Sequence, residues 1–220
     1  MDNVKKTVEE IRSKGVKSIG ISADVTVRED IDKVVKAIIK SWGAVHILIN
    51  NAGGGGRWGS EVVEGTKEEV WLEVYNKNAI AAVRFTMKLI PYMQKQRWGR
   101  VVTVASIYGR EGGGRPWFNM AKSAEISLMK TLAMNPILVR GGITFNSIAP
   151  GAIMIPNTGW AEEREKDPKG FKRKVLDKIP IGRLGSPEEV ADLAVFICST
   201  KAGFLNGACV VVDGGQSRSF

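Results

Sequence analysis

The stretch VHILINNAG, residues 45–53, combines an apolar run with small and polar residues that follow it directly. Its first part, Val45–Ile49, is short and nearly continuous in apolar character, which is typical of a strand buried on both faces. Strands of this kind occur in parallel sheets that helices cover on both sides. The stretch therefore predicts an α/β protein in which Asn50 to Gly53 stand at the end of a central strand.

Helical and strand patterns alternate on both sides of this stretch. Apolar spacing or an opening cap predicts helices at 3–14, 29–42, 66–96, 117–139 and 186–199. Apolar runs predict strands at 16–22, 45–49, 101–105, 143–148 and 210–212. Such alternation favours a doubly wound parallel sheet in one domain, residues 1–220, with ligands bound at the carboxyl ends of the strands.

Two sequences of the capping-box type open predicted helices. They are Thr66-Lys-Glu-Glu69 and Ser186-Pro-Glu-Glu189, in which the first side chain accepts a hydrogen bond from the backbone and the glutamate returns one. The second also carries proline at the first helical position. Both sequences predict where a helix begins.

Composition bounds the class of protein. The chain has 220 residues, 44% of them hydrophobic and 25% charged, which is ordinary for a globular domain. No apolar run is long enough to span a bilayer, the charged N-terminus does not resemble a signal peptide, and Cys198 and Cys209 lie in apolar surroundings without CxxC spacing. These features predict a cytoplasmic protein with reduced cysteines and no membrane partner.

The net charge of +9 does not indicate a nucleic-acid partner, because the basic residues are scattered and no nucleic-acid-binding motif accompanies them. An acidic substrate or an acyl carrier protein is compatible with that charge. His46, the only histidine, is expected on the surface, and no metal site is predicted.

Further motifs occur in order along the chain. They are ADVT at 23–26, NNAG at 50–53, Asn78, GRVVTVAS at 99–106, NSIAPG at 146–151, IGRLGSPEEV at 181–190 and VDGG at 212–215. Together they resemble the short-chain dehydrogenase/reductase family over nearly the whole chain. The resemblance implies a Rossmann-like fold, NAD or NADP as cofactor, and hydride transfer between a ketone and a secondary alcohol, the small-molecule substrate.

The resemblance also assigns roles to residues. Ser106 would polarise the carbonyl, Lys122 would bind the ribose and Asn78 would order a water that leads to Lys122. The cofactor would be lined by Asp24, Asn50, Ala52, Gly53, Lys122, Pro150, Gly151 and Ile153. The segment from about Ile155 to Gly185 would be the substrate lid, and the helices at 67–96 and 117–139 would form a homo-tetramer or dimer.

Phe118 departs from the family pattern. The family's Tyr-x-x-x-Lys stands here as Phe118-Asn-Met-Ala-Lys122, and none of the three tyrosines, Tyr75, Tyr92 and Tyr108, has lysine four residues later. A phenylalanine has no proton to give, and loss of a general acid typically slows catalysis by about 10²–10⁴-fold. A natural non-catalytic relative and a deliberate Tyr→Phe substitution both fit this pattern.

The second departure from the family pattern is that residues 1–220 contain no counterpart of the family's opening βαβ unit with its TGxxxGIG turn. Such a turn presents backbone N–H groups to the pyrophosphate, so cofactor binding is expected to be weakened or lost. A start codon placed too late is the alternative explanation. One formal G-x-G-x-x-G match, Gly54, Gly56 and Gly59, opens no helix and is interpreted as a loop.

Without that unit the segment Val16–Ser22 loses its expected neighbour in the sheet. Unpaired strand edges are costly, so our hypothesis is that Val16–Ser22 moves to pair directly with Val45–Ile49 in a five-stranded sheet.

Two functions remain open on the sequence. One is an NAD(P)-dependent oxidoreductase impaired by Phe118 and by the absent turn. The other is a non-catalytic protein that uses the same scaffold for binding or oligomerisation. Substrate, cofactor preference and reaction direction are not indicated.

Overall fold

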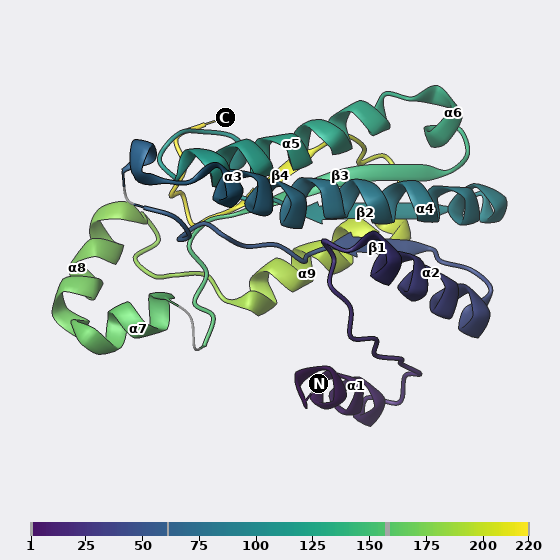
Figure 1. The fold of residues 1–220 in the computed structure, drawn as a ribbon, viewed down its shortest axis with the longest axis horizontal. Coiled ribbons are helices and arrows are strands. Elements are labelled where there is room, and N and C mark those ends of the chain that lie inside the picture. The colour runs from purple at the N-terminus through teal and green to yellow at the C-terminus, as the bar shows by residue number, and fades with distance from the viewer. Residues whose placement is uncertain (1, 61, 157–158, 220) are drawn as a thin grey trace.

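A computed structural model describes residues 2–60, 62–156 and 159–219 (Figure 1). Its sheet has four parallel strands in the order β1-β2-β3-β4. They are β1 (Ile47–Asn50), β2 (Gly99–Val104), β3 (Ile143–Pro150) and β4 (Cys209–Val212). The α/β class and the parallel sheet predicted from the sequence are confirmed.

Helices cover both faces of this sheet. The helices of the described residues are α1 (Asp2–Ser13), α2 (Arg28–Trp42), α3 (Glu68–Tyr75), α4 (Ala81–Gln96), α5 (Pro116–Ala133), α6 (Pro136–Val139), α7 (Gly159–Lys166), α8 (Pro168–Lys178) and α9 (Pro187–Cys198), and α1, α7 and α8 lie away from the sheet (Figure 1). Short 3₁₀ turns lie at Val63–Gly65, Ile107–Gly109 and Thr200–Ala202, and a π-helical turn lies at Asn76–Ile80. In Figure 1, α4 and α5 run along one side of the sheet and α9 along the other.

Two neighbouring residues of β2 show why the strand has apolar side chains on both faces. Val101 packs with Met129 of α5 in one core cluster, whereas Val102 packs with Ile197 of α9 in another, and all four side chains are buried. Successive strand side chains point to opposite faces, so a strand with helices on both sides needs apolar residues on each of them.

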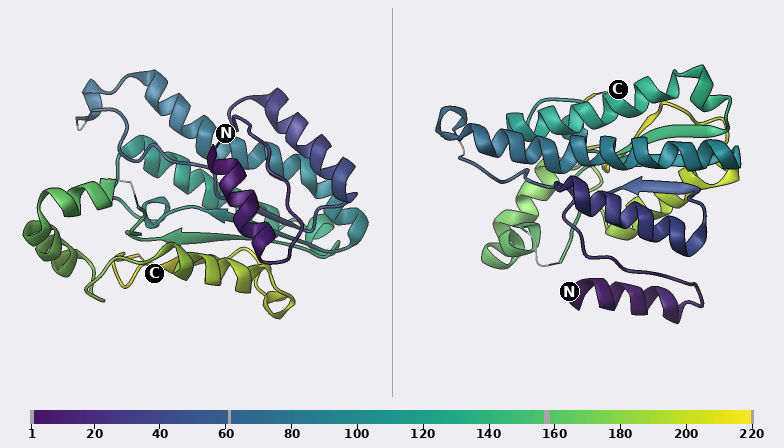
Figure 2. Two further views of the ribbon diagram at one scale, coloured as in Figure 1. Left: turned by 90° about the horizontal axis from the view of Figure 1, so that it is seen from below. Right: turned by 45° about the vertical axis from the view of Figure 1, so that its right-hand side comes forward.

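The predicted strand at Val16–Ser22 is wrong. The segment is extended but pairs with no described strand, and Val16 and Ile19 are exposed. It contacts α1 instead, since Ser18 Oγ donates to Val8 O at 3.2 Å and Arg12 Nη2 donates to Ser18 O at 3.0 Å. Figures 1 and 2 show α1 lying apart from the sheet, with this segment leading away from it. Because local contacts to α1 hold the segment, it does not reach β1, and the described sheet has four strands rather than five.

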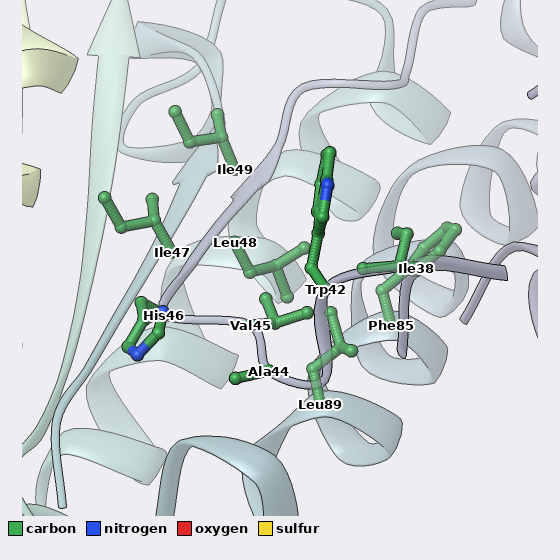
Figure 3. A pocket seen from close by; sticks show the side chains of 10 residues that line it. All are labelled: Ile38, Trp42, Ala44, Val45, His46, Ile47, Leu48, Ile49, Phe85 and Leu89. Carbon is green, nitrogen blue, oxygen red and sulfur yellow. The ribbon is translucent and has the colours of Figure 1, made fainter. Parts of the chain in front are cut away.

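The position beside β1 is an apolar groove of about 450 Å³ (Figure 3). Side chains of α2, α4 and β1 face it, among them Trp42, Phe85 and Leu89. Ile47 and Ile49 of β1 are 44% and 45% exposed there. β1 is therefore an edge strand of the described sheet, although its sequence is that of a strand buried on both faces.

The long helix predicted at 66–96 is divided, and its predicted start is corrected. α3 begins at Glu68 after Lys67, without a side-chain cap, because Thr66 Oγ1 accepts a hydrogen bond from Ser60 N at 2.9 Å. The π-helical turn then separates α3 from α4. By contrast, Ser186 and Glu189 form the predicted capping box at the start of α9.

No helix in the described part of the chain is both long and apolar enough to cross a membrane. The residues that the structure describes also contain no group of three or more His, Cys, Asp or Glu side chains that could hold a metal ion.

Candidate functional site

The carboxyl ends of the strands meet at one edge of the sheet, as parallel strands require. Asn50 of β1 lies opposite Thr103 of β2, Val104 of β2 opposite Ile148 of β3, and Pro150 of β3 opposite Val212 of β4. The residues that follow these strands are those singled out from the sequence: Asn51 to Gly53, Ser106, and Gly151 with Ile153.

Lys122 is buried within this region, although a lysine on a helix is ordinarily solvated. Only 5% of the residue is exposed. Its Nζ donates to Val104 O at 3.0 Å, the backbone at the end of β2, and to Glu125 Oε2 at 2.9 Å. Helix α5 thus delivers a cation to the carboxyl end of β2, with a carboxylate one turn further along as its counter-charge.

Asn78 lies in the π-helical turn and is fully buried. Its Nδ2 donates to Val74 O at 2.7 Å and to Gly54 O at 2.9 Å, and its Oδ1 accepts from Gly54 N at 3.1 Å. π-helical turns are rare in proteins, and those that occur are often found at functional sites. Here the turn aims an amide at the loop that follows NNAG.

Gly53 brings these two side chains together. A Cβ atom at this position would lie 2.5 Å from Asn78 Oδ1 and 3.3 Å from Lys122 Nζ. Real Cβ atoms do not approach an oxygen so closely, so the close convergence of loop, amide and ammonium requires glycine. The three predicted residues Gly53, Asn78 and Lys122 are therefore neighbours in space.

Ser106 ends the extended segment after β2. It is buried and caps the 3₁₀ turn Ile107–Gly109, with its Oγ accepting a hydrogen bond from Tyr108 N at 3.2 Å. An accepting hydroxyl still has its own O–H to donate.

Phe118 stands in the first turn of α5, one turn before Lys122. Its ring centroid lies 5.7 Å from Lys122 Nζ. On its other side the ring faces the loop, because a Cβ on Gly56 would be 3.5 Å from it. The Phe118 ring, which the sequence places at the position of the family tyrosine, therefore lies beside the Lys122 ammonium.

Asn50 and Asp24 have local structural roles in addition to those predicted. Asn50 Nδ2 donates to Thr86 Oγ1 and Thr103 Oγ1, both at 3.2 Å, which ties β1 to α4 and β2. Asp24 accepts hydrogen bonds from the side chain and the backbone N–H of Thr26, and these lower the pKa of its carboxyl. This turn precedes α2.

Gly151 lies against the VDGG turn, and Ile153 lies against the end of the predicted lid segment. A Cβ on Gly151 would be 2.7 Å from Asp213 Cβ, and Ile153 forms an isolated parallel bridge with Gly185. Burial alone would raise the pKa of Asp213, but hydrogen bonds from Ser217 and from the backbone N–H groups of Gly215 and Gln216 lower it. These hydrogen bonds hold the turn around the Asp213 carboxylate.

The segment predicted as a lid contacts the loop after β1 through residues that were not predicted. Within the segment 155–185, Trp160 of α7 packs edge-on against Phe171 of α8, with ring centroids 6.2 Å apart. The Arg57 guanidinium lies 5.2 Å from the Trp160 ring centroid and 3.8 Å from Glu163. Cation–aromatic contacts between distant segments leave no periodic signal in a sequence, so the sequence could not reveal this one. Asn157 and Thr158 of the predicted lid lie outside the described residues.

The glycine-rich loop at 54–59 opens no helix and is held by Arg115. Arg115 Nη1 donates to the carbonyl oxygens of Arg57, Trp58 and Gly59 at 2.9, 2.6 and 2.7 Å. This agrees with its interpretation from the sequence as a loop that opens no helix.

Comparison with known proteins gives matches over nearly the whole chain. A family model described as "Enoyl-(Acyl carrier protein) reductase" matches residues 1–217. A 3-oxoacyl-[acyl-carrier-protein] reductase of Staphylococcus epidermidis is 32% identical over 216 residues, which are 98% of this chain and 84% of that protein. One of Thermotoga maritima is 35% identical over 193 residues, covering 87% of this chain and 74% of that protein.

Solved structures agree. L-sorbose reductase from Gluconobacter frateurii, complexed with NADPH and L-sorbose, superposes with a TM-score of 0.90 at 30% identity, covering 100% of this chain and 85% of the other. A 7α-hydroxysteroid dehydrogenase complexed with NADH and 7-oxo glycochenodeoxycholic acid gives 0.86 at 26% identity, covering 99% and 82%. With its parallel sheet, its converging Gly53, Asn78 and Lys122, and these matches, the chain belongs to the short-chain dehydrogenase/reductase family of oxidoreductases.

Proposed function

We propose that this protein is an NAD(P)-dependent oxidoreductase that interconverts a ketone and a secondary alcohol, with turnover slowed by Phe118. The observation that carries the proposal is the buried convergence of Lys122, Asn78 and Gly53 at the carboxyl ends of the strands. A cation that is costly to bury is kept beside a glycine that leaves room for a close approach.

The residues present fit the ribose and nicotinamide end of a dinucleotide. Lys122 has three N–H donors, and its hydrogen bonds to Val104 O and Glu125 Oε2 leave one for a ribose hydroxyl. Gly53, Ala52 and the backbone after Asn50 would line one side of the nicotinamide nucleotide. Pro150, Gly151 and Ile153 would line the other side, and Asp24 would hold the adenine end.

The bound dinucleotide would supply the hydride, and the protein would supply the polar environment of the carbonyl. Ser106 would donate its hydroxyl proton in a hydrogen bond to the carbonyl oxygen, where negative charge develops. The Lys122 ammonium would stabilise the same charge at longer range. Asn78 would hold the loop at Gly54 and order a water toward Lys122.

Phe118 weakens the proposed enzyme. It places a ring without a proton at the position of the acid, so the alkoxide lacks its direct donor.

The proposed substrate is a small carbonyl compound or alcohol. The relatives named above are 3-oxoacyl-[acyl-carrier-protein] reductases or are complexed with L-sorbose or 7-oxo glycochenodeoxycholic acid, which supports carbonyl–alcohol chemistry and leaves the substrate open. Trp160 and Phe171 give the proposed lid an apolar core. The exposed Met87 on α4 and Met120 on α5 support assembly with further copies of the chain.

Restoring the phenol tests this function. Phe118→Tyr is expected to raise the rate of NADPH- or NADH-dependent reduction of a 3-oxoacyl thioester or L-sorbose by about 10²–10⁴-fold, because a general acid contributes that much. Nicotinamide absorbance measures the rate. Tyr92→Phe, which changes a phenol in the core cluster on α4, is the control and should leave the rate unchanged.

A second candidate function rests on Phe118 itself. A protein that binds a dinucleotide or assembles without chemistry needs the ring's packing but not a phenol. Dinucleotide binding by Phe118→Tyr without any gain in turnover on either substrate would favour this candidate and contradict the first.

A further inference from the structure

The most unusual buried group in the described chain is the Glu125 carboxylate. It is 1% exposed, and it is the only acidic residue among the buried residues that the structure describes. Lys122 and Glu125 stand three positions apart on α5, so their side chains project from the same face of the helix toward the sheet. Their charged atoms are 2.9 Å apart, with side-chain exposures of 7% and 1%.

Burial makes this pair a specific arrangement rather than a surface contact. Burial raises the pKa of Glu125, and the neighbouring Lys122 ammonium opposes that rise. Neither charge could remain in this environment without the other, because an isolated buried ion loses its solvation. The two residues therefore act as one unit.

The pair fixes the direction of the Lys122 ammonium. Glu125 Oε2 and Val104 O each accept a hydrogen bond from Nζ, which leaves one of its three N–H donors. A Gly53 Cβ would lie 3.3 Å from Nζ, so the loop after β1 borders the same ammonium. Without Glu125, the long lysine side chain could rotate away from this position.

We propose that Glu125 is a positioning residue, which holds the Lys122 ammonium so that its free N–H points to the ribose of a bound nicotinamide dinucleotide. This inference rests on the proposed function, since the ribose is the group to be held. Glu125 itself does not touch the dinucleotide. Its effect passes entirely through Lys122.

The first test measures Lys122 without any cofactor. Glu125→Gln removes the counter-charge and keeps the shape of the side chain. Acetic anhydride labelling followed by peptide mass spectrometry should show Lys122 acetylated about tenfold faster in the variant, because an unpaired buried amine more readily loses its proton or moves to solvent. Asp32→Asn, which breaks the surface ion pair between Asp32 and Lys88, is the matched control and should not change Lys122 labelling.

The second test measures dinucleotide binding in a double-mutant cycle. Titration with NADPH and NADH, followed by nicotinamide fluorescence, should show affinity about tenfold weaker for Glu125→Gln, because a charge-assisted hydrogen bond becomes misaligned. In a Lys122→Met background, Glu125→Gln should have no further effect, because the residue it acts through is gone. A purely structural role would give additive losses.

Glu125→Asp covers the case in which Glu125→Gln does not fold. It keeps the charge but shortens the side chain by one methylene, so labelling and affinity should fall between those of the native chain and the expected values for Glu125→Gln. Unchanged Lys122 labelling, tighter dinucleotide binding or additive losses would overturn the positioning role. If the native chain binds neither dinucleotide while labelling still responds to Glu125, the proposed function fails and the coupling of the two residues stands.

Discussion

Gly53 lies in the candidate site close to both Asn78 Oδ1 and Lys122 Nζ. The site needs glycine here, because a Cβ atom would come too close to the Asn78 oxygen. The NNAG motif indicated this glycine from the sequence. The motif did not indicate which atoms approach it, since Asn78 and Lys122 come from two other helices.

Gly53→Ala is expected to impair both folding and binding. The new methyl group would displace the Asn78 amide and break its hydrogen bonds with Gly54, and such buried losses cost about 1–3 kcal/mol each. Thermal unfolding should show a lower Tm, and nicotinamide fluorescence should show weaker NADPH and NADH binding.

Gly112→Ala is the matched control, because a Cβ there has no heavy atom within 4 Å and the backbone is not left-handed. Equal effects of the two substitutions would contradict the close packing at Gly53.

Lys122, Ser106 and Asn78 were predicted from the sequence, whereas Glu125 was not. A lysine and a glutamate three residues apart on a helix are usually a solvated pair, and nothing in their spacing indicates burial. Burial arises because α5 packs against β2 and β3, and those contacts are separated from Glu125 by many residues. The importance of Glu125 could therefore be seen only in three dimensions.

At the scale of the elements, capping-box sequences predicted the start of one helix correctly and the start of another wrongly. The capping box at Ser186 was confirmed, because both of its hydrogen bonds lie within one turn. The similar sequence at Thr66 was wrong, because Thr66 Oγ1 bonds to Ser60 in the preceding loop. The π-helical turn at Asn78 was not predicted. Its Asn78 side chain hydrogen-bonds to the loop at Gly54, and such a contact leaves no mark on the helical periodicity of the sequence.

The capping box at α9 gives a pH prediction. Hydrogen bonds from Arg183 and from Ser186 N lower the pKa of Glu189 from its ordinary value of 4.5 to about 2. A lowered folded-state pKa stabilises the fold above pH 4.5, and this stabilisation is lost as the pH falls toward 2. Glu189→Gln should therefore lower Tm near neutral pH. The Tm difference between the variant and the native chain should shrink as the pH falls from 4.5 toward 2.

Thermal unfolding at a series of pH values measures this difference. Glu188→Gln removes a neighbouring acid outside the capping box and controls for net charge. A Tm difference for Glu189→Gln that does not depend on pH would contradict the assignment.

At the scale of the whole molecule, the parallel order of the sheet followed from alternating helices and strands, but the number of strands did not. Val16–Ser22 has a strand-like pattern and yet contacts α1, because strand pairing depends on a neighbour that the pattern cannot specify. The apolar groove beside β1 is the structural result of that difference. The candidate site lies at the carboxyl ends of the strands, so the order of β1, β2 and β3 suffices to assemble Gly53, Lys122 and Gly151.

The most direct test of the account is whether the 220-residue chain binds a nicotinamide dinucleotide through Lys122. Titration with NADPH and with NADH, followed by nicotinamide fluorescence, should give a saturable change with at least one of them. Lys122→Met should weaken that binding about tenfold or more, because it removes a charge-assisted hydrogen bond to the ribose. A native chain that shows no saturable change with either dinucleotide, or binding that Lys122→Met leaves unaltered, would contradict the account.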